Sequence, residues 1–505
     1  MKLSKLLESL REKTMDGRTD PEITGVSTDS REVRSGHLFI AIAGSTEDGH
    51  RYVKQAIEKG AVAVVGEHLS AEPGSEAVWV RVPNSRIAAA FLAEAYYGYP
   101  SRELDLVGIT GTNGKSSTLY LTRSVLDAAG VSSSAIGTIC YSVAGETEQA
   151  RNTTPGPVHI SSALRRAVDA GNKYFVMEVS SHALHQYRVE ALQFKVGVYT
   201  NLSLDHLDYH KSMDEYFNAK RHLFELLKDE TGASCAVISA DDARSGEIAA
   251  ATKAPKITFG IHKVADIRAE NIQLASSHTR FDIRTSRGTF PVTLKLLGRH
   301  SVYNALAAAG VCMALDIDLQ TIKEGLEALE LVPGRFERIA EGQPFEVIVD
   351  YAHTPEAMEL LLKSARSICR GKLIVVFGAG GDRDRSKRPL MGKLAASHAD
   401  FTVITSDNPR SEDPYRIALD VEIGFQRVGK ERGQNYLVMI DRREAIEEAL
   451  ATAEAGDIVV IAGKGHETYQ VFRDGTVEFD DRAIARAWLK SMSKRDSANG
   501  HDDTH

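Results

Sequence analysis

The residues best suited to chemistry lie in a glycine-flanked loop between an apolar run and a helical pattern. Residues 104–109 are mainly apolar, and Thr110-Gly-Thr-Asn-Gly-Lys-Ser-Ser117 follows, after which apolar residues recur at helical spacing. Glycines let the backbone turn close to an anion, and N–H groups at a helix N-terminus point at phosphate oxygens. The loop departs from G-x-x-x-x-G-K-[ST] at Ile109, where the pattern has glycine. It predicts a nucleotide-phosphate site made by Gly111, Thr112, Asn113, Gly114, Lys115, Ser116 and Ser117, with the Ser116 hydroxyl on Mg²⁺.

Two further segments place metal-binding side chains directly after predicted buried strands. Glu178 ends the apolar run 174–178, and His206 lies in a cluster with Asp205, Asp208 and His210 after the run 196–200. Ligands of parallel α/β sheets collect at the carboxyl ends of the strands, and hard cations prefer oxygen donors. We therefore expect Glu178 and His206 to bind a metal or phosphate. A helix-capping or salt-bridging role is the alternative for Glu178, and a structural role is the alternative for His206.

A lysine falls on the apolar face of a predicted helix over residues 213–227. At a period of 3.6 residues, Lys220 lies in the middle of the apolar stripe, whereas Arg221 does not. A buried cation is costly unless it is paired or chemically altered, so we expect Lys220 to be ion-paired or modified. The alternative is a side chain that extends along the apolar surface to reach water.

Composition excludes several classes of protein. The chain has 505 residues, 43% of them hydrophobic, and a net charge of −8, which gives no basic field for nucleic acid or anionic lipid. Its four cysteines are scattered and lack C-x-x-C pairing, which suits a reducing compartment. No apolar run reaches the ~20 residues that span a bilayer, and the first residues predict an amphipathic helix instead of a signal peptide. We expect a cytoplasmic protein, without nucleic acid or membrane insertion.

Strand-like and helical patterns alternate along most of the chain, which predicts an α/β fold of three domains. A small α/β module covers residues 1–100. A central P-loop domain with a parallel sheet covers 101–332 and includes an antiparallel insertion between residues 267 and 296. A C-terminal Rossmann-like domain covers 333–492, with each strand followed by a loop and a helix. The polar residues 493–505 predict a disordered tail.

Together, the phosphate loop, Glu178-Val-Ser-Ser-His182, Asn201-Leu-Ser-Leu-Asp-His206 and Lys220 resemble the Mur ligases, ATP-dependent enzymes that add amino acids to peptidoglycan precursors. The resemblance implies an ATP site between the central and C-terminal domains, with contacts from Asn304, Arg335 and Asp350. It implies a carbamylated Lys220 that binds a second Mg²⁺ beside Ser116, Glu178 and His206, with Lys115, Lys220, His206 and Glu178 as the catalytic residues. His300-Ser301 depart from the family pattern, which has Phe-Asn or His-Asn there.

Within the family, the chain is most similar to the branch that extends UDP-N-acetylmuramoyl-L-alanyl-D-glutamate. The resemblance places Thr28 and Ser30 at the uridine-nucleotide site, in the segment Ser27-Thr-Asp-Ser-Arg31. It assigns the muramoyl-dipeptide site to Asn152, Thr153, Thr154, Ser180, Gln186 and Arg188. It assigns the incoming amino acid to three loops that follow strands, through Arg388, Asp407, Asn408, Pro409, Arg410, Gly463 and Glu467.

The Asp407-Asn-Pro-Arg410 loop resembles the branch that adds meso-diaminopimelate, because lysine-adding members carry another residue at the arginine position. Arg410 would pair with the second carboxylate of diaminopimelate, and Glu467 would receive an ammonium group. The implied reaction transfers the γ-phosphoryl group of ATP to the D-glutamyl carboxylate, and the amine attacks the acyl phosphate. We expect a monomer whose C-terminal domain moves on binding. An L-lysine-adding enzyme, a folylpolyglutamate synthase and a nucleotide-binding switch or scaffold are the alternatives.

Overall fold

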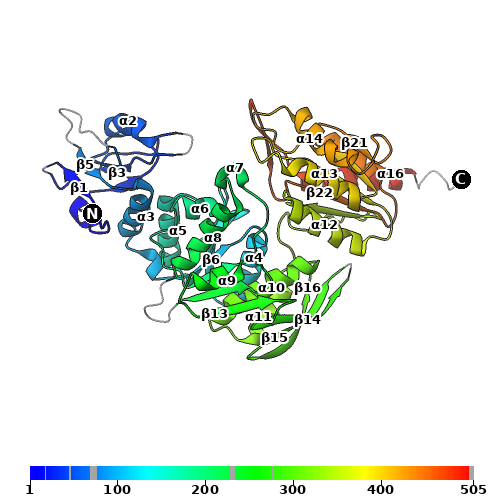
Figure 1. The fold of residues 1–505 in the computed structure, drawn as a ribbon, viewed down its shortest axis with the longest axis horizontal. Coiled ribbons are helices and arrows are strands. Elements are labelled where there is room, and N and C mark those ends of the chain that lie inside the picture. The colour runs from blue at the N-terminus through cyan, green and yellow to red at the C-terminus, as the bar shows by residue number, and fades with distance from the viewer. Residues whose placement is uncertain (18, 45–46, 69–76, 228–233, 276, 500–505) are drawn as a thin grey trace.

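A computed structural model describes residues 1–17, 19–44, 47–68, 77–227, 234–275 and 277–499, the last seven of these as backbone only. Three sheets of five or more strands follow one another along the chain, and the N- and C-terminal parts lie on either side of the middle part (Figure 1). The expected three-part α/β architecture is therefore present. Within the described residues, no helix has the length and apolar character needed to cross a membrane.

The N-terminal part is a five-stranded sheet of order β1-β5-β4-β3-β2, parallel except for β1. Its strands are β1 (Thr14–Asp16), β2 (Gly25–Ser27), β3 (His37–Ile40), β4 (Ala63–Gly66) and β5 (Val78–Arg81), and its helices are α1 (Leu3–Leu7), α2 (Val53–Glu58) and α3 (Ser85–Tyr96). The predicted amphipathic helix at the N-terminus is α1, whose three leucines are buried.

The middle part contains an eleven-stranded sheet in which β6 lies between β11 and β10, both parallel to it. The strands are β6 (Asp105–Thr110), β7 (Ser133–Ile136), β8 (Cys140–Val143), β9 (Glu146–Gln149), β10 (Tyr174–Glu178), β11 (Val196–Tyr199), β12 (Cys235–Ser239), β13 (Lys256–Gly260), β14 (Ile267–Leu274), β15 (Thr279–Thr285) and β16 (Gly288–Leu294). The helices are α4 (Lys115–Ala128), α5 (Pro157–Asp169), α6 (Ser181–His185), α7 (Leu207–His210), α8 (Met213–Glu225), α9 (Ser245–Ala250), α10 (Arg299–Ala314) and α11 (Leu319–Ala328). The predicted antiparallel insertion is confirmed as β14–β16, which extend the same sheet.

The C-terminal part is a six-stranded sheet of order β17-β18-β22-β19-β20-β21, parallel from β18 onward. Its strands, with a separate hairpin β23–β24, are β17 (Glu337–Arg338), β18 (Glu346–Asp350), β19 (Leu373–Phe377), β20 (Phe401–Ile404), β21 (Tyr436–Val438), β22 (Ile458–Ala462), β23 (Tyr469–Phe472) and β24 (Gly475–Glu478). Its helices are α12 (Pro355–Ile368), α13 (Lys387–His398), α14 (Pro414–Gln426), α15 (Arg442–Thr452) and α16 (Asp481–Asn499).

Two expectations for the C-terminal part differ from the structure. The hairpin β23–β24 follows β22, where the alternation of strand and helix predicts a helix directly after the loop. The helix α16 also continues through residues 493–499, which we expected to belong to a disordered tail. Lysine, arginine, serine and alanine in this stretch are compatible with a helix that is already anchored by the buried Leu489. Residues 500–505 of the expected tail lie outside the described residues.

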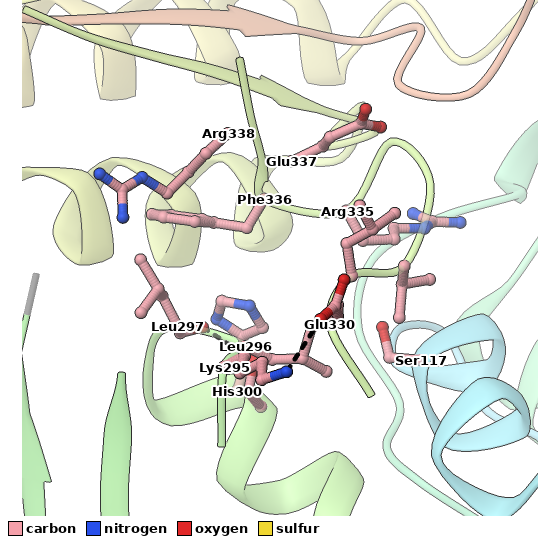
Figure 2. A pocket seen from close by; sticks show the side chains of 13 residues that line it. Ser117, Lys295, Leu296, Leu297, His300, Glu330, Arg335, Phe336, Glu337 and Arg338 are labelled. Carbon is pink, nitrogen blue, oxygen red and sulfur yellow. Dashed lines mark hydrogen bonds and ion pairs between the residues drawn. The ribbon is translucent and has the colours of Figure 1, made fainter. Parts of the chain in front are cut away.

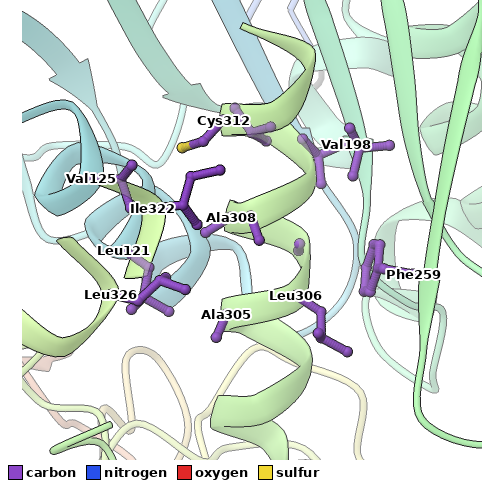
Figure 3. Packing of buried hydrophobic residues seen from close by; sticks show 14 of the residues in the cluster. Leu121, Val125, Val198, Phe259, Ala305, Leu306, Ala308, Cys312, Ile322 and Leu326 are labelled. Atoms are coloured by element: carbon purple, nitrogen blue, oxygen red, sulfur yellow. The ribbon is translucent and has the colours of Figure 1, made fainter. Parts of the chain in front are cut away.

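The helix that begins at the phosphate loop is held by unusually close packing. Leu121 and Val125 of α4 face Ile322 and Leu326 of α11, and α10 packs against both helices and against the sheet (Figure 3). Gly325 makes the approach of α11 to α4 possible, because a Cβ atom there would lie 2.8 Å from the Ser124 carbonyl oxygen. The Ser124 hydroxyl donates to the Gly325 carbonyl at 2.6 Å.

Replacing Gly325 with alanine tests this packing. Alanine is favoured over glycine in a helix by about 1 kcal/mol, but overpacking against the α4 backbone costs typically 1–3 kcal/mol. We expect Gly325→Ala to lower the midpoint of the middle part's thermal unfolding transition in calorimetry. Gly246→Ala in α9 is the matched control, because a Cβ atom there meets nothing within 4 Å, and its midpoint should stay or rise. A Gly325→Ala protein as stable as the wild type would contradict the close packing.

Candidate active site

The phosphate loop has the geometry that its glycines predict. Gly111 and Gly114 adopt φ angles of +147° and +87°, and a Cβ at Gly111 would collide with the Thr200 side chain. Gly114 precedes the first residue of α4 and lies against the Asn304 side chain, so the predicted contact residue Asn304 is brought to the loop. Lys115 Nζ donates to the carbonyl oxygens of Gly111 and Thr112, both at 2.9 Å. Burial lowers the pKa of Lys115.

Glu178 is joined to this loop at the carboxyl end of β10. Its Oε1 accepts hydrogen bonds from the Ser116 hydroxyl and the Thr138 amide, both at 2.8 Å, and its Oε2 accepts from the Thr138 hydroxyl at 2.8 Å. The side chain is buried. Sequence reasoning missed Thr138, which follows β7 and is recognisable only once β7 is known to neighbour β10.

Lys220 is buried, with 1% of its surface exposed, so a route along the surface to water is excluded. Within the described residues it has neither a hydrogen bond nor an ion pair, and its Nζ lies 4.2 Å above the Tyr216 ring. The Tyr216 hydroxyl in turn lies 3.1 Å from Thr112 Oγ1 of the phosphate loop. Burial, followed by the charge of Lys115, lowers the pKa of Lys220 well below its usual value. Of the two predicted states, ion-paired or modified, the unmodified side chain shows no ion pair.

The loop after β11 meets the C-terminal part of the chain at Asp205. Its carboxylate lies 3.5 Å from His206 Nε2, 3.6 Å from Lys387 Nζ and 3.7 Å from His353 Nε2. Burial would raise the pKa of Asp205, but the interaction with His353 and the nearby positive charges hold it well below its usual value. Burial lowers the pKa of His206 to about 2, so its ring is neutral. Lys387 and His353 were not predicted as site residues, because only the fold brings them to this loop.

Arg335 reaches the phosphate loop from the segment that connects the two larger sheets. Its Nη2 lies 3.3 Å from Ser116 Oγ, and its guanidinium lies 4.3 Å from the centre of the Tyr351 ring. Asp350, by contrast, uses both carboxylate oxygens to accept backbone N–H groups, from Phe336 at 2.6 Å and from Ala352 at 2.7 Å. Asp350 therefore shapes the segment that carries Arg335.

A cavity of about 150 Å³ adjoins the loop between α4, α10 and this connecting segment (Figure 2). Ser117, His300, Arg335 and Phe336 line it, with the centres of the His300 and Phe336 rings 6.1 Å apart. At the position where the chain departs from the family pattern, the Ser301 hydroxyl donates at 2.8 Å to the carbonyl of Leu297, which precedes the start of α10.

The residues predicted for the muramoyl-dipeptide site form one network. The Thr154 hydroxyl donates to the Glu178 carbonyl at 2.9 Å and accepts from the Ser180 amide at 3.0 Å. Arg188 Nη1 donates to the Thr154 carbonyl at 2.6 Å, and its Nη2 donates to Gln186 Oε1 at 2.8 Å. The neighbouring Thr153 hydroxyl lies 3.1 Å from that of Thr138, and the Asn152 carbonyl accepts from Tyr141.

Thr28 and Ser30 lie in the turn after β2, in the N-terminal part. The Ser30 hydroxyl donates to Gln55 Oε1 at 2.7 Å, and Thr28 is half-buried. No contact joins either residue to the phosphate loop within the described residues.

The predicted amino-acid site lies at one edge of the C-terminal sheet, where β22, β19 and β20 end. Arg410, at φ +52°, donates through Nη1 to the Gly381 carbonyl at 2.7 Å, while its Nε and Nη2 have no hydrogen-bond partner among the described residues. Glu467 accepts from Asn408 Nδ2 at 2.9 Å, and a Cβ at Gly463 would lie 2.6 Å from Asp407 Oδ2. Pro409 lies between Asn408 and Arg410, with its carbonyl carbon 2.7 Å from where a Cβ of Gly381 would stand.

Arg388 was expected to bind the incoming amino acid, but in the structure its guanidinium is already paired. It is buried at the start of α13, and its guanidinium contacts Glu412 at 2.8 Å and Asp420 at 2.9 Å. Its Nη2 also donates to the Gly380 carbonyl at 3.1 Å. A substrate carboxylate would have to compete with these two internal carboxylates for the guanidinium.

Comparisons with known proteins agree with this geometry. Three segments match family models described as "Mur ligase family, catalytic domain" (residues 22–97), "Mur ligase middle domain" (109–312) and "Mur ligase, glutamate ligase domain" (334–465). A curated UDP-N-acetylmuramoyl-L-alanyl-D-glutamate--2,6-diaminopimelate ligase from Bacillus licheniformis is 46% identical, over 96% of this chain and 99% of its own length. The chain belongs to the Mur ligase family. It is accordingly an enzyme of the ligase class.

Solved structures place this Mur ligase among proteins of the same fold. One is a UDP-N-acetylmuramoyl-L-alanyl-D-glutamate--2,6-diaminopimelate ligase with 30% identity and a TM-score of 0.66, covering 98% of this chain and 100% of that one. Another is a folylpolyglutamate synthase from Mycobacterium tuberculosis, with 18% identity and a TM-score of 0.63, covering 80% of this chain and 95% of that one. At that identity the second match shows a shared fold alone.

The Mur ligase site offers oxygen donors for a hard cation. No cluster of three or more histidine, cysteine, aspartate or glutamate residues that would hold a metal is found within the described residues. The Ser116 hydroxyl and the Glu178 carboxylate are nevertheless in contact beside the phosphate loop, and nucleotide phosphates and water complete such sites in other enzymes. The donor set therefore fits Mg²⁺ that is bound together with a nucleotide.

The helix that carries Lys220 is anchored by a histidine whose charge depends on pH. His222 Nε2 lies 2.7 Å from Glu190 Oε2, and its Nδ1 lies 2.9 Å from Glu225 Oε2. The contact with Glu190 and that with Glu225 raise the pKa of His222 to about 9, against the effect of burial. A raised folded-state pKa gives stability that is complete below pH 6.5 and is lost as the pH rises to about 9.

We expect the stability difference between wild type and His222→Gln to depend on pH in that sense. At pH 6 the variant should be less stable by up to about 3 kcal/mol, since each pKa unit is worth 1.36 kcal/mol. At pH 9.5 most of the difference should be gone. Thermal unfolding midpoints at the two pH values check this, with the exposed His262→Gln as the control. A difference that is the same at both pH values would count against a charged His222.

Proposed function

We propose that this Mur ligase joins meso-2,6-diaminopimelate to UDP-N-acetylmuramoyl-L-alanyl-D-glutamate at the expense of ATP, as a monomer in the cytoplasm, in peptidoglycan precursor synthesis. The observation that carries the proposal is the 46% identity, over 96% of the chain, to a relative named for this reaction. Further curated relatives with the same name are 42%, 44% and 46% identical to this chain. In the structure, Arg410 supports the choice of diaminopimelate, because two of its three nitrogens have no hydrogen-bond partner among the described residues and suit a second carboxylate.

The arrangement of the two larger sheets supports a ligation that uses two facing sites. A cleft of about 380 Å³ is lined by Thr138 from the middle part and by Glu467, Thr468 and Tyr469 from the C-terminal part. At this cleft, His466 Nε2 of the C-terminal part lies 3.2 Å from the Thr138 carbonyl oxygen of the middle part. Because Thr138 also binds Glu178, the amino-acid loop opens beside the proposed phosphate and metal side of the site. We assign residues 1–100, 101–332 and 333–492 to uridine-nucleotide, ATP and amino-acid binding respectively.

In the proposed mechanism, the amides of residues 111–117 and the Lys115 ammonium hold the triphosphate of ATP. Arg335 adds a second positive charge beside Ser116, and the cavity lined by His300 and Phe336 receives the base. Asn304 supports the loop from α10, and Asp350 keeps Arg335 in place through the Phe336 amide. These residues offset the charge that spreads over the γ-phosphoryl group during transfer.

Ser116, Glu178, His206 and a carbamylated Lys220 would hold Mg²⁺, which supplies charge neutralisation at the phosphates when bound. The D-glutamyl carboxylate, positioned by Thr154, Ser180 and Arg188, attacks the γ-phosphorus, and the bond to ADP breaks. The amine of diaminopimelate then attacks the acyl carbon and phosphate leaves. Amide, ADP and phosphate are the products. Lys220 is buried and has no hydrogen-bond or ion-pair partner in the part of the chain that the structure describes, which supports carbamylation, because a carbamate removes the cation.

Phosphate release tests the proposed reaction and the role of Arg410. Purified protein with ATP, Mg²⁺ and the UDP-muramoyl dipeptide should release phosphate with meso-diaminopimelate and far less with L-lysine at equal concentration. Arg410→Gln should raise the KM for diaminopimelate by about tenfold or more, because a charge-assisted hydrogen bond is worth roughly 1.5–3 kcal/mol.

Arg427→Gln, an exposed arginine on the same part of the chain, is the matched control and should leave that KM unchanged. Release with lysine in place of diaminopimelate would keep the family and reassign the Asp407–Arg410 loop. Release with neither amino acid would favour a folate substrate or a non-enzymatic role, as in the two remaining alternatives.

Carbamylation of Lys220 predicts that activity depends on dissolved carbon dioxide. Wild-type activity should fall in buffer freed of carbon dioxide and return on addition of bicarbonate. Lys220→Met, which has a similar volume without the amine, should lose about 10- to 100-fold in turnover, as expected for a group that positions a metal. It should not respond to bicarbonate. Arg221→Met is the control, since Arg221 is half-buried and pairs with Glu225 instead. A wild-type turnover that is the same with and without carbon dioxide would contradict the carbamylation of Lys220.

A further inference from the structure

A second lysine of the site is completely buried, and the proposed mechanism does not use it. Lys464 follows β22, between Gly463 at φ +113° and Gly465 at φ +54°. Its side chain is 0% exposed, and its Nζ donates to Glu467 Oε2 at 2.9 Å and to Asn408 Oδ1 at 3.1 Å. Unlike Lys220, this buried ammonium therefore has a carboxylate and an amide as partners, which joins two loops of the amino-acid site.

The contacts of Lys464 leave Glu467 with one free oxygen. Glu467 Oε2 receives two hydrogen bonds, from Lys464 Nζ and from Asn408 Nδ2, both at 2.9 Å. Oε1 receives none from the described residues, and the Glu467 side chain is 15% exposed, on the wall of the cleft that Thr138 and Tyr469 also line. A carboxylate held through one oxygen presents the other in a fixed place, which is what an ammonium group of a substrate requires.

Lys464 also determines the orientation of the Asn408 side-chain amide. Asn408 Oδ1 accepts from Lys464 Nζ and, at 3.0 Å, from the Val471 amide of β23. A flipped amide would turn its NH₂ group toward these two donors, so the orientation with Nδ2 toward Glu467 is the only one that pairs every group. Asn408, Glu467 and Lys464 thus close a triangle of hydrogen bonds in which each side chain contacts the other two.

We infer that Lys464 is a positioning residue for the incoming amino acid, because it holds Glu467 and Asn408 in the one arrangement that leaves Glu467 Oε1 for a substrate ammonium group. The inference rests on the proposed function, since it assigns the substrate's ammonium group to Glu467. It concerns recognition and not phosphoryl transfer, because no contact joins Lys464 to the phosphate loop among the described residues.

The variant Lys464→Met removes the ammonium group and keeps an unbranched apolar side chain in the same space. Glu467 then keeps only Asn408 as a partner and is free to turn. We expect the KM for diaminopimelate to rise by about tenfold or more, the usual effect of losing a charge-assisted hydrogen bond. The KM values for ATP and the UDP-muramoyl dipeptide should stay within about twofold, because uniform damage would change all three. Phosphate release at varied concentrations of each substrate gives the three values.

Glu467→Gln and the double variant complete a cycle that separates positioning from stability. If Lys464 acts through Glu467, the double variant should be little worse than Glu467→Gln alone. Lys490→Met, an exposed lysine 3.8 Å from Glu341, is the matched control and should leave all three KM values unchanged. Lys464→Gln keeps a hydrogen-bond donor at this position and should raise the KM for diaminopimelate less than Lys464→Met does. If the methionine variant does not fold, the glutamine variant tests whether Lys464 positions Glu467.

A Lys464→Met protein with a lower unfolding temperature and an unchanged KM for diaminopimelate would reduce Lys464 to a structural role and overturn the inference. A wild-type protein that is active with diaminopimelate, beside variants that raise all three KM values equally, would overturn it as well while leaving the proposed function intact. A wild-type protein that releases no phosphate with diaminopimelate would overturn the proposed function first and the inference with it.

Discussion

One hydroxyl group, Ser116 Oγ, links the parts of the chain on which the site depends. It donates to Glu178 Oε1 at 2.8 Å and contacts Arg335 Nη2 at 3.3 Å. The first contact connects the start of α4 to the end of β10, and the second brings a cation from the connecting segment across to the same point. The hydroxyl is in place only because Gly111 and Gly114 let the backbone turn there and Gly325 lets α11 support α4. Small residues far apart in the sequence thus determine where charges meet.

The buried cations of the site differ in the partners that the fold supplies. Arg442 and Asp481 are both 0% exposed and pair at 2.7 Å, and Arg442 also donates to the Ala462 carbonyl at 3.0 Å. Lys464 is satisfied by Glu467 and Asn408. Lys220 alone among these three has no hydrogen-bond or ion-pair partner in the described part of the chain. An unpaired buried charge is far more costly than a paired one. Of these three cations, Lys220 is therefore the one whose burial most favours a chemical modification that removes the charge.

Local patterns in the sequence predict the features that depend on residues close together in the chain, such as buried strands and the faces of helices. Apolar runs locate the buried strands, with β10 at its expected bounds, and helical spacing places Lys220 on the buried face of α8. The contacts of Asp205 with Lys387 and His353, and those of Glu178 with Thr138, depend on how separate strands meet, which no local pattern contains. The pairing of Arg388 with Glu412 and Asp420 escaped prediction for the same reason. An arginine suited to a substrate carboxylate is equally suited to an internal one.

The amino-acid loop and the phosphate loop are mechanically connected through backbone that leaves no space for side chains. Gly334, at φ +65°, precedes Arg335. A Cβ atom at Gly465 would lie 2.6 Å from the carbonyl oxygen of Gly334. The loop that carries Lys464 and Glu467 therefore packs directly on the segment that carries Arg335 to Ser116. A shift of either loop must displace the other, because neither glycine contact can absorb it. The main chain at these glycines therefore couples the position of the loop that carries Glu467 to that of the segment that places Arg335 beside Ser116.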